Sequence, residues 1–184
     1  MFRLDQETGI VAEARLVRSP NCDDRPAECP PSLLVVHGIS LPPGEFGGPY
    51  IDHLFTNSLD PTAHSYFEEV VGMQVSSHFL IRRDGELVQY VPVDRRAWHA
   101  GESIHGGRRR CNDFSIGIEL EGQDEIPYEE AQYRCLAELI MTLRTRIESL
   151  QDADIVGHSD ISPGRKTDPG PAFNWNTLNG LLQA

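Results

Sequence analysis

The stretch Ser32-Leu33-Leu34-Val35-Val36-His37 is the strongest indication of the class of fold. Its apolar run is continuous rather than alternating, which is typical of a β-strand buried on both faces. Such strands belong to sheets that are covered by helices on both sides. We expect the strand to end at His37, which places an imidazole at one edge of the sheet.

Further elements follow this strand along the chain. Apolar runs predict strands over residues 78–81, 86–91, 115–121 and 154–156. The first two flank Arg82-Arg83-Asp84-Gly85, and Asp-Gly between apolar runs is a strong hairpin signal. Helices are predicted over residues 50–55, 64–71, 128–147 and 174–182, and an irregular segment over 92–113. We therefore expect an α/β (α+β) fold with a central mixed sheet flanked by helices.

The chain has 184 residues, a length that suits one domain with a single core. Residues 21–31 are polar and rich in proline, so they are interpreted as a loop that leads into the first strong strand. We expect a single domain over residues 1–184, with a lead-in over 1–31 and a core that carries the site over 32–176. A monomer is the simplest expectation.

Charge and cysteine content narrow the possible partners and location. The formal net charge is -12, which argues against nucleic acid or an anionic membrane as the main partner. The first residues form neither a secretion signal nor a membrane span, and the four cysteines lack zinc-ribbon spacing. We expect a cytoplasmic protein, although pairing of Cys22 with Cys29 stays open.

Seven of the sixteen basic residues lie between Arg82 and Arg110. One interpretation is a solvated rim that balances an acidic body. The other is an anion-attracting wall around a cleft that holds a carboxylate-bearing ligand.

The segment GHSDISPGRKTDPGP, residues 157–171, carries the clearest sign of chemistry. It places Asp168 ten positions after His158 in a loop rich in proline and glycine, and histidine with carboxylate is a typical zinc-ligand combination. Between them lies Lys166, the only lysine of the chain, which can stabilise a developing anion. This pattern indicates a hydrolytic metal site.

Two histidines stand out among seven because of their position. His37 and His158 each terminate a predicted apolar strand and enter a Gly/Pro-containing loop, a placement that holds an imidazole rigidly. His78 and His99 are the alternatives, either as ligands or as groups of the core.

Glu119 is a carboxylate in the middle of an apolar strand. It shares one face of residues 115–121 with Ser115 and Gly117. Such a residue is either the partner of an arginine, a base with a raised pKa, or part of a half-exposed strand face.

Six blocks of sequence, in order along the chain, resemble a known superfamily. They are SLLVVH (32–37), ISLPPGEFGG (39–48), VSSH (75–78), RRAWHAG (95–101), CNDFSIGIELEG (111–122) and RKTDPG (165–170). They are similar to the zinc N-acetylmuramoyl-L-alanine amidases of the amidase-2 and peptidoglycan-recognition superfamily. Within it the chain most resembles the branch that acts on soluble 1,6-anhydro-muropeptides in bacterial cell-wall recycling.

The resemblance implies one zinc ion held by His37, His158 and Asp168. It also implies that Glu119 is the catalytic carboxylate and Lys166 the catalytic lysine. His78 and His99 then lie behind the metal ligands or in the pocket wall.

The implied reaction is hydrolysis of the amide between the lactyl group of the muramic acid and L-alanine. We hypothesise that Trp98 packs on the sugar, while Arg110 and Asn112 hydrogen-bond the sugar or the peptide. One departure is Gly38, where related recycling enzymes usually have asparagine. The alternatives are a lytic amidase on polymeric peptidoglycan and a non-catalytic recognition module.

Overall fold

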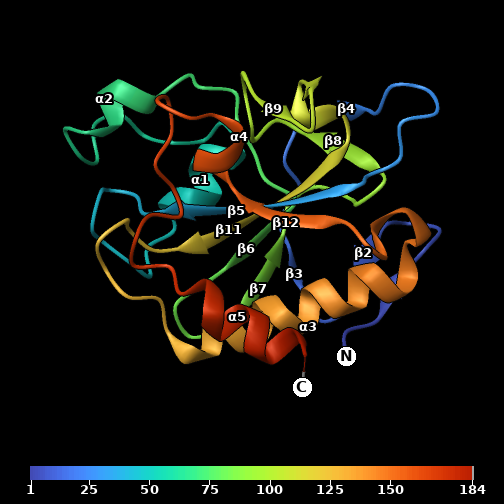
Figure 1. The fold of residues 1–184 in the computed structure, drawn as a ribbon. Coiled ribbons are helices and arrows are strands. Elements are labelled where there is room, and N and C mark those ends of the chain that lie inside the picture. Colours follow the sequence, from blue (N-terminus) through green and yellow to red (C-terminus); the bar gives the residue numbers. More distant parts are fainter. Residues whose placement is uncertain (184) are drawn as a thin grey trace.

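A six-stranded mixed sheet forms the centre of the protein in the computed structural model, which describes residues 1–183 (Figure 1). The strands lie in the order β12 (Asp154–Gly157), β5 (Leu33–Ile39), β11 (Ser115–Glu121), β6 (Phe79–Ile81), β7 (Leu87–Gln89) and β3 (Arg15–Leu16). The first four are parallel to one another. β6 and β7 form the expected antiparallel hairpin, and β3 pairs parallel with β7. The prediction of a mixed sheet is confirmed.

Short strand pairs surround the sheet, and none of them was predicted. β1 (Leu4–Asp5) pairs with β2 (Ile10–Val11), and β9 (Ile104–His105) pairs with β10 (Arg108–Arg109). β4 (Cys22–Asp24) pairs with β8 (Arg95–Ala97). The segment described from sequence as a lead-in therefore contributes β3 to the main sheet and β4 to a ribbon. Strands of two or three residues are too short to show a periodic pattern.

Helices cover both faces of the sheet. α3 (Glu130–Arg146) and α5 (Trp175–Leu182) lie below the sheet in Figure 1, whereas α1 (Tyr50–Phe55), α2 (Phe67–Val70) and α4 (His158–Ile161) lie above it. Two 3₁₀ turns, Cys111–Asp113 and Glu148–Leu150, complete the regular structure. α3 begins at a capping box in which Gln132 Oε1 accepts from the backbone N–H of Glu129. No helix among residues 1–183 is both long enough and apolar enough to span a membrane.

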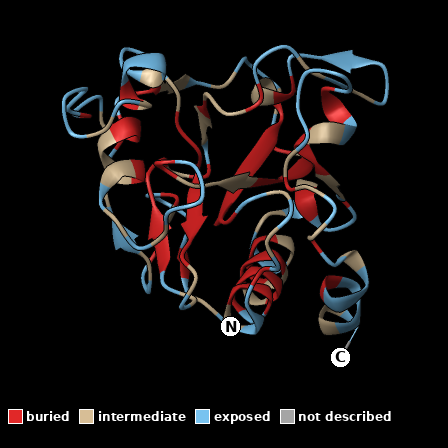
Figure 2. Cartoon of the chain, turned by 90° about the vertical axis from the view of Figure 1, so that its left-hand side faces the viewer, coloured by how far each residue is buried: buried red, intermediate tan, exposed pale blue. Residues whose placement is uncertain are grey.

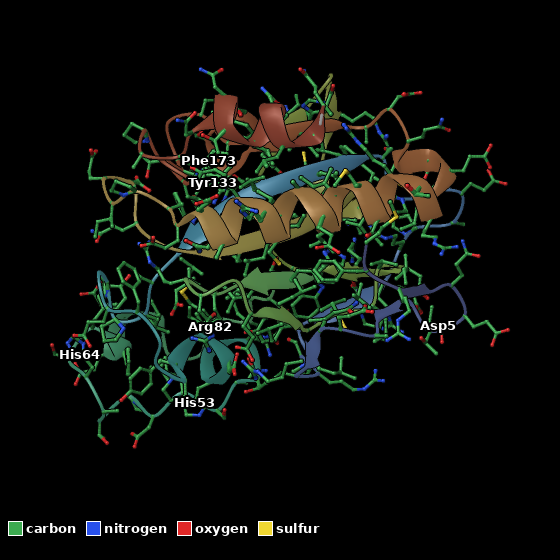
Figure 3. All side chains as sticks on the ribbon, turned by 90° about the horizontal axis from the view of Figure 1, so that it is seen from below. Asp5, His53, His64, Arg82, Tyr133 and Phe173 are labelled. Atoms are coloured by element: carbon green, nitrogen blue, oxygen red, sulfur yellow. The ribbon has the colours of Figure 1, made fainter. Side chains whose placement is uncertain are left out.

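Alternate residues of the central strands pack against opposite layers. Leu34 and Val36 face the core formed with α3, whereas Leu33 and Val35 face a cluster that includes Ile161 of α4. Figure 2 shows the buried strands and the buried inner side of α3. Figure 3 shows Tyr133 and Phe173 together between α3 and α5, where their ring centroids lie 5.2 Å apart.

Several boundaries differ from the sequence expectation. β5 continues past His37 to Ile39, because β11 pairs along its whole length and Gly122 N–H then donates to the Ile39 carbonyl. His158 opens α4 instead of ending a strand, and α2 is shorter than residues 64–71. Residues 92–113, predicted as irregular, contain β8, β9, β10 and a 3₁₀ turn.

Candidate active site

The parallel register brings three polar side chains to one end of the sheet. Glu119 of β11 pairs with His37 of β5, and β12 runs beside β5 and delivers His158 at its carboxyl end. The carboxyl ends of parallel strands are the usual position of ligand sites in open α/β sheets. Asp168 reaches the same point because its carbonyl accepts from the Ser159 backbone N–H.

His37, His158 and Asp168 form a compact triangle of ligand atoms. The two Nδ1 atoms lie 3.0 Å apart, and each lies 3.1 Å from Asp168 Oδ2. At zinc–ligand distances of about 2.0–2.1 Å, tetrahedral ligands are separated by roughly 3.3 Å. The three residues therefore have the donor types and the spacing of a metal site.

The charge state of the triangle also favours a cation. His158 Nε2 lies 3.1 Å from the Ala100 carbonyl, and a ring whose single proton is donated there keeps its lone pair on Nδ1. Burial is the main cause that lowers the pKa of His37, to about 4. For Asp168 burial acts to raise the pKa, but the contacts with His158 and His37 outweigh it and lower the pKa. Lone pairs thus converge on one point, which is the arrangement that a cation site requires.

Glu119 points into the same region without a partner of its own. The residue is 9% exposed, and among residues 1–183 its buried Oε2 has no hydrogen-bond partner. Burial is the main cause that raises its pKa well above the ordinary value, and the charge of Asp168 adds to this. An arginine partner, which the sequence left open, is not found in the described chain.

A cavity of about 580 Å³ joins these groups. Its wall includes His37, Glu119, His158, Lys166 and Asp168. Lys166 is exposed and forms no ion pair in the part of the chain that the structure describes. Another, largely apolar part of the wall comes from α1, α2 and their loops, with Leu54, Phe55, Tyr66, Val70, Met73 and Val75. The five residues singled out from the sequence thus meet in one cavity.

His78 and His99 lie behind the triangle. His99 Nδ1 is 2.8 Å from His37 Nε2, and its ring also lines the cavity. His78 lies deeper, where it accepts from the Gly117 backbone N–H and its Nε2 is 3.0 Å from the Arg95 carbonyl. Burial is the main cause that lowers its pKa to about 3. The other histidines lie elsewhere, with His53 and His64 near α1 and α2 in Figure 3.

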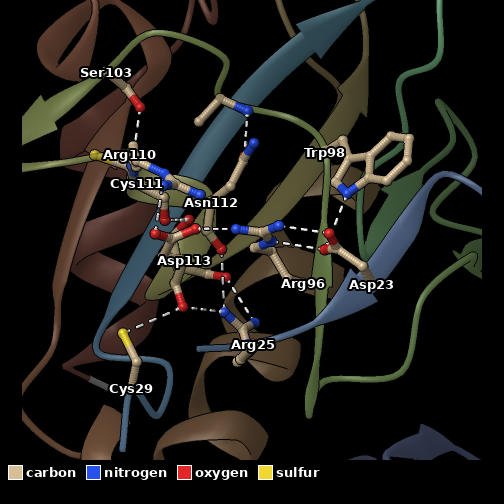
Figure 4. A network of polar contacts seen from close by, with 12 residues as sticks. Asp23, Arg25, Cys29, Arg96, Trp98, Ser103, Arg110, Cys111, Asn112 and Asp113 are labelled. Carbon is tan, nitrogen blue, oxygen red and sulfur yellow. Dashed lines mark hydrogen bonds and ion pairs between the residues drawn. The ribbon is translucent and has the colours of Figure 1, made fainter. Parts of the chain in front are cut away.

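The structure does not bring Trp98, Arg110 and Asn112 into this cavity. Figure 4 shows them in a separate network, in which Trp98 Nε1 donates to Asp23 and Asn112 Oδ1 accepts from the backbone of residues 99 and 100. Arg110 is largely exposed and pairs with Asp113. Their contacts with a substrate stay a prediction.

Five of the seven arginines between positions 82 and 110 form ion pairs with acids, and Arg108 lies over the ring of Phe114. Arg82 pairs with buried Glu121 at 3.1 Å, and Arg96 pairs with Asp23 and Asp113. No arginine among the described residues lines the cavity. These ion pairs favour the interpretation of the arginines as a rim that balances the charge of an acidic body. All four cysteines are free.

Tyr128 is a residue of the site that the sequence did not single out. Its hydroxyl donates to the Pro169 carbonyl at 2.9 Å, next to Asp168. The ring lies so close to β5 that a Cβ at Gly38 would be 2.3 Å from the hydroxyl oxygen. An asparagine at position 38 would therefore require Tyr128 to move. No motif or spacing marks this contact, because it joins residues far apart in the chain.

Comparison with known proteins agrees with this geometry. Residues 27–171 match the family described as N-acetylmuramoyl-L-alanine amidase (amidase-2). The chain is 58% identical over 176 residues to the 1,6-anhydro-N-acetylmuramyl-L-alanine amidase AmpD of Enterobacter cloacae, a match that covers 96% of this chain and 94% of that protein.

Solved structures give the same result. A crystal structure of a selenomethionine AmpD derivative superimposes with a TM-score of 0.94 at 58% identity, covering 98% of this chain and 99% of that one. The Escherichia coli amidase AmiD, in complex with anhydro-N-acetylmuramic acid-L-Ala-D-gamma-Glu-L-Lys, matches with a TM-score of 0.59 at 32% identity, over 84% of this chain and 59% of that one. The chain belongs to the N-acetylmuramoyl-L-alanine amidase family.

Proposed function

We propose that this protein is a zinc-dependent amidase that cleaves the bond between the lactyl group of 1,6-anhydro-N-acetylmuramic acid and L-alanine in muropeptides. The identity to AmpD over nearly the whole chain supports the substrate class, as does the AmiD complex with an anhydro-muropeptide. We place the activity in a single domain over residues 1–184, acting as a cytoplasmic monomer in peptidoglycan recycling.

One zinc ion is held by His37, His158 and Asp168 in this proposal. Their spacing and their lone pairs support the assignment. A zinc ion held by these residues would activate the attacking water by lowering its pKa to about 7. The protein must then supply a base for the water and a cation for the oxyanion that forms on the lactyl carbonyl.

Glu119 is the base in this mechanism. Its carboxylate takes the proton of the attacking water and returns it to the amine of L-alanine as that amine leaves. The unpartnered Oε2 in the cavity wall is the observation that carries the proposal, because a buried carboxylate without a partner is otherwise costly. Its raised pKa also suits a group that both accepts and donates a proton.

Lys166 stabilises the developing oxyanion. It is the lysine of the cavity wall, two residues before Asp168, and its ammonium is free to approach a substrate. Removing one such donor typically costs about 10²–10³ in kcat. We therefore expect a loss of that size in Lys166→Ala. Steady-state kinetics of Lys166→Arg checks whether charge alone suffices, since full activity there would exclude a requirement for the amine.

Trp98, Arg110 and Asn112 are proposed to contact the sugar or the peptide. Because all three lie outside the cavity, such contacts require the loop that carries Trp98 and Arg110 to move. They also require the Asn112 side chain to leave its hydrogen bonds with the backbone of residues 99 and 100. The candidate moving segments are the stretch after His37 and residues 92–110. An unchanged KM in Trp98→Ala would remove Trp98 from this proposal.

One assay compares two substrates. The metal-quantified protein is incubated with anhydro-muropeptide and with intact sacculi, and the released peptides are identified by mass. We expect release of the peptide, beginning at L-alanine, from the soluble substrate. Cleavage of sacculi alone would contradict the recycling assignment, and no cleavage with zinc bound would indicate a recognition module.

A further inference from the structure

A line of hydrogen bonds runs from His37 into the core of the protein. His37 Nε2 lies 2.8 Å from His99 Nδ1, and His99 Nε2 lies 3.0 Å from Ser115 Oγ. Ser115 Oγ in turn lies 2.6 Å from the carbonyl oxygen of Cys111. Once the proton at one end of such a line is placed, the positions of the other protons follow from it.

The Cys111 carbonyl, at the inner end of the line, sets the direction of its hydrogen bonds. A carbonyl oxygen only accepts, so the Ser115 hydroxyl donates to Cys111. The Ser115 oxygen must then accept from His99 Nε2–H. A neutral His99 with its proton on Nε2 has a lone pair on Nδ1, which accepts from His37 Nε2–H. The Nδ1 atom of His37 is thereby left with its lone pair facing His158 and Asp168.

The packing around His99 fixes its ring. The rings of His37 and His99 meet edge to face, with centroids 5.0 Å apart and planes at 90° to each other. The ring fits because residue 117 is glycine: a Cβ there would lie 2.5 Å from His99 Cγ. The ring is thus confined between β11 and His37.

Asn112 holds the backbone that carries this ring. Its Oδ1 accepts from the N–H of His99 at 3.1 Å and of Ala100 at 2.7 Å. The Ala100 carbonyl is also the acceptor for His158 Nε2. Residues 99 and 100 therefore contact both histidines of the triangle on the side away from the metal position.

We propose that His99 is a positioning residue which, together with Ser115, holds His37 as the Nε2–H tautomer and so presents the Nδ1 lone pair to the metal. This inference rests on the proposed metal site, but it assigns a distinct role to groups that bind no metal. Partners of this kind typically contribute about 10- to 100-fold to metal affinity.

Zinc affinity of three variants tests the role. His99→Phe keeps a ring in the space beside Gly117 but removes the acceptor, whereas His99→Asn retains an acceptor close to the Nδ1 position. His105→Phe is the control, since His105 contacts Asp154 at 2.9 Å away from the site. Competition with a chromophoric chelator should show zinc binding weakened about 10- to 100-fold in His99→Phe, largely recovered in His99→Asn and unchanged in the control.

The tautomer can be read directly in the wild-type protein without metal. Long-range ¹H–¹⁵N correlation spectra should show the proton of His37 on Nε2. A proton on Nδ1, or zinc affinity in a folded His99→Phe within threefold of wild type, would overturn the inference. Wild-type protein that binds zinc but cleaves no muropeptide would instead contradict the proposed function, so the two failures are distinguishable.

Discussion

Burial sets the chemistry of several side chains around the site. Glu119 and His78 are buried in the protein, where a charge is costly unless it is paired. Burial therefore raises the pKa of the Glu119 carboxyl and lowers the pKa of the His78 imidazole. It also lowers the pKa of His37 to about 4, so this imidazole keeps its Nδ1 lone pair at neutral pH.

The low pKa of His78 predicts that acid destabilises the fold. Burial, with Arg25 nearby, lowers this pKa from 6.5 to about 3, so the unfolded chain binds a proton more readily than the folded one. The contribution of neutral His78 to the free energy of unfolding is complete above pH 6.5. It is lost as the pH falls toward 3, at about 1.4 kcal/mol per pH unit. Urea unfolding of the metal-free protein between pH 7 and 5 should show a steeper loss of stability in wild type than in His78→Gln.

A surface histidine provides the comparison for this measurement. His105→Gln should keep the wild-type dependence of unfolding free energy on pH, since the ring is partly exposed beside Asp154. Equal slopes for wild type and His78→Gln would show that His78 does not carry the effect.

At the scale of elements, strands with a continuous apolar pattern could be predicted from the sequence. Short elements without such a pattern could not. Residues 115–121 and the hairpin that follows His78 form strands where the sequence places them. β5 was expected to end at His37, because its apolar run ends there, yet pairing with β11 extends it by two residues. α4 has four residues and a glycine before it, which is too little pattern to predict a helix.

α3 supplies the main support of the sheet from one side. Leu136 lies at the middle of this helix and is fully buried in the larger core cluster. We expect Leu136→Ala to lower the free energy of unfolding by about 2–5 kcal/mol, through lost apolar contact and the cavity it leaves. Chemical denaturation measures this loss. Arg134→Ala on the exposed side of α3 should change stability by less than about 1 kcal/mol, and a loss as large as that of Leu136→Ala would contradict the packing described.

For the whole molecule, the segment before Ser32 is a structural part of the site. Arg25 sends its guanidinium into the interior and donates to the carbonyls of residues 93, 112, 113 and 115. Figure 4 shows it beside Asp113 and Asn112. It thereby holds the loop behind His99. Sequence analysis could not identify this role, because a single arginine in a proline-rich loop carries no periodic signal, and its partners lie at least 53 positions away.

Replacement of Arg25 should therefore destabilise the whole fold. Arg25→Met leaves several buried carbonyls without their donor, at about 1–3 kcal/mol for a buried group left unsatisfied. We expect the free energy of unfolding to fall by roughly 3 kcal/mol, as measured by urea denaturation. Arg18→Met, at an exposed position of the same segment, is the control. A difference in unfolding free energy below about 0.5 kcal/mol between the two variants would show that Arg25 does not hold these carbonyls in place.

The central claim of this account is that the buried, unpartnered carboxylate of Glu119 serves as the base beside a metal held by His37, His158 and Asp168. The direct test is to measure zinc content and kcat on anhydro-muropeptide in one preparation of Glu119→Gln. General acid–base catalysis contributes about 10²–10⁴-fold, so kcat should fall by that factor while zinc binding stays at one ion per chain. A kcat within about fivefold of wild type with zinc bound would contradict the claim.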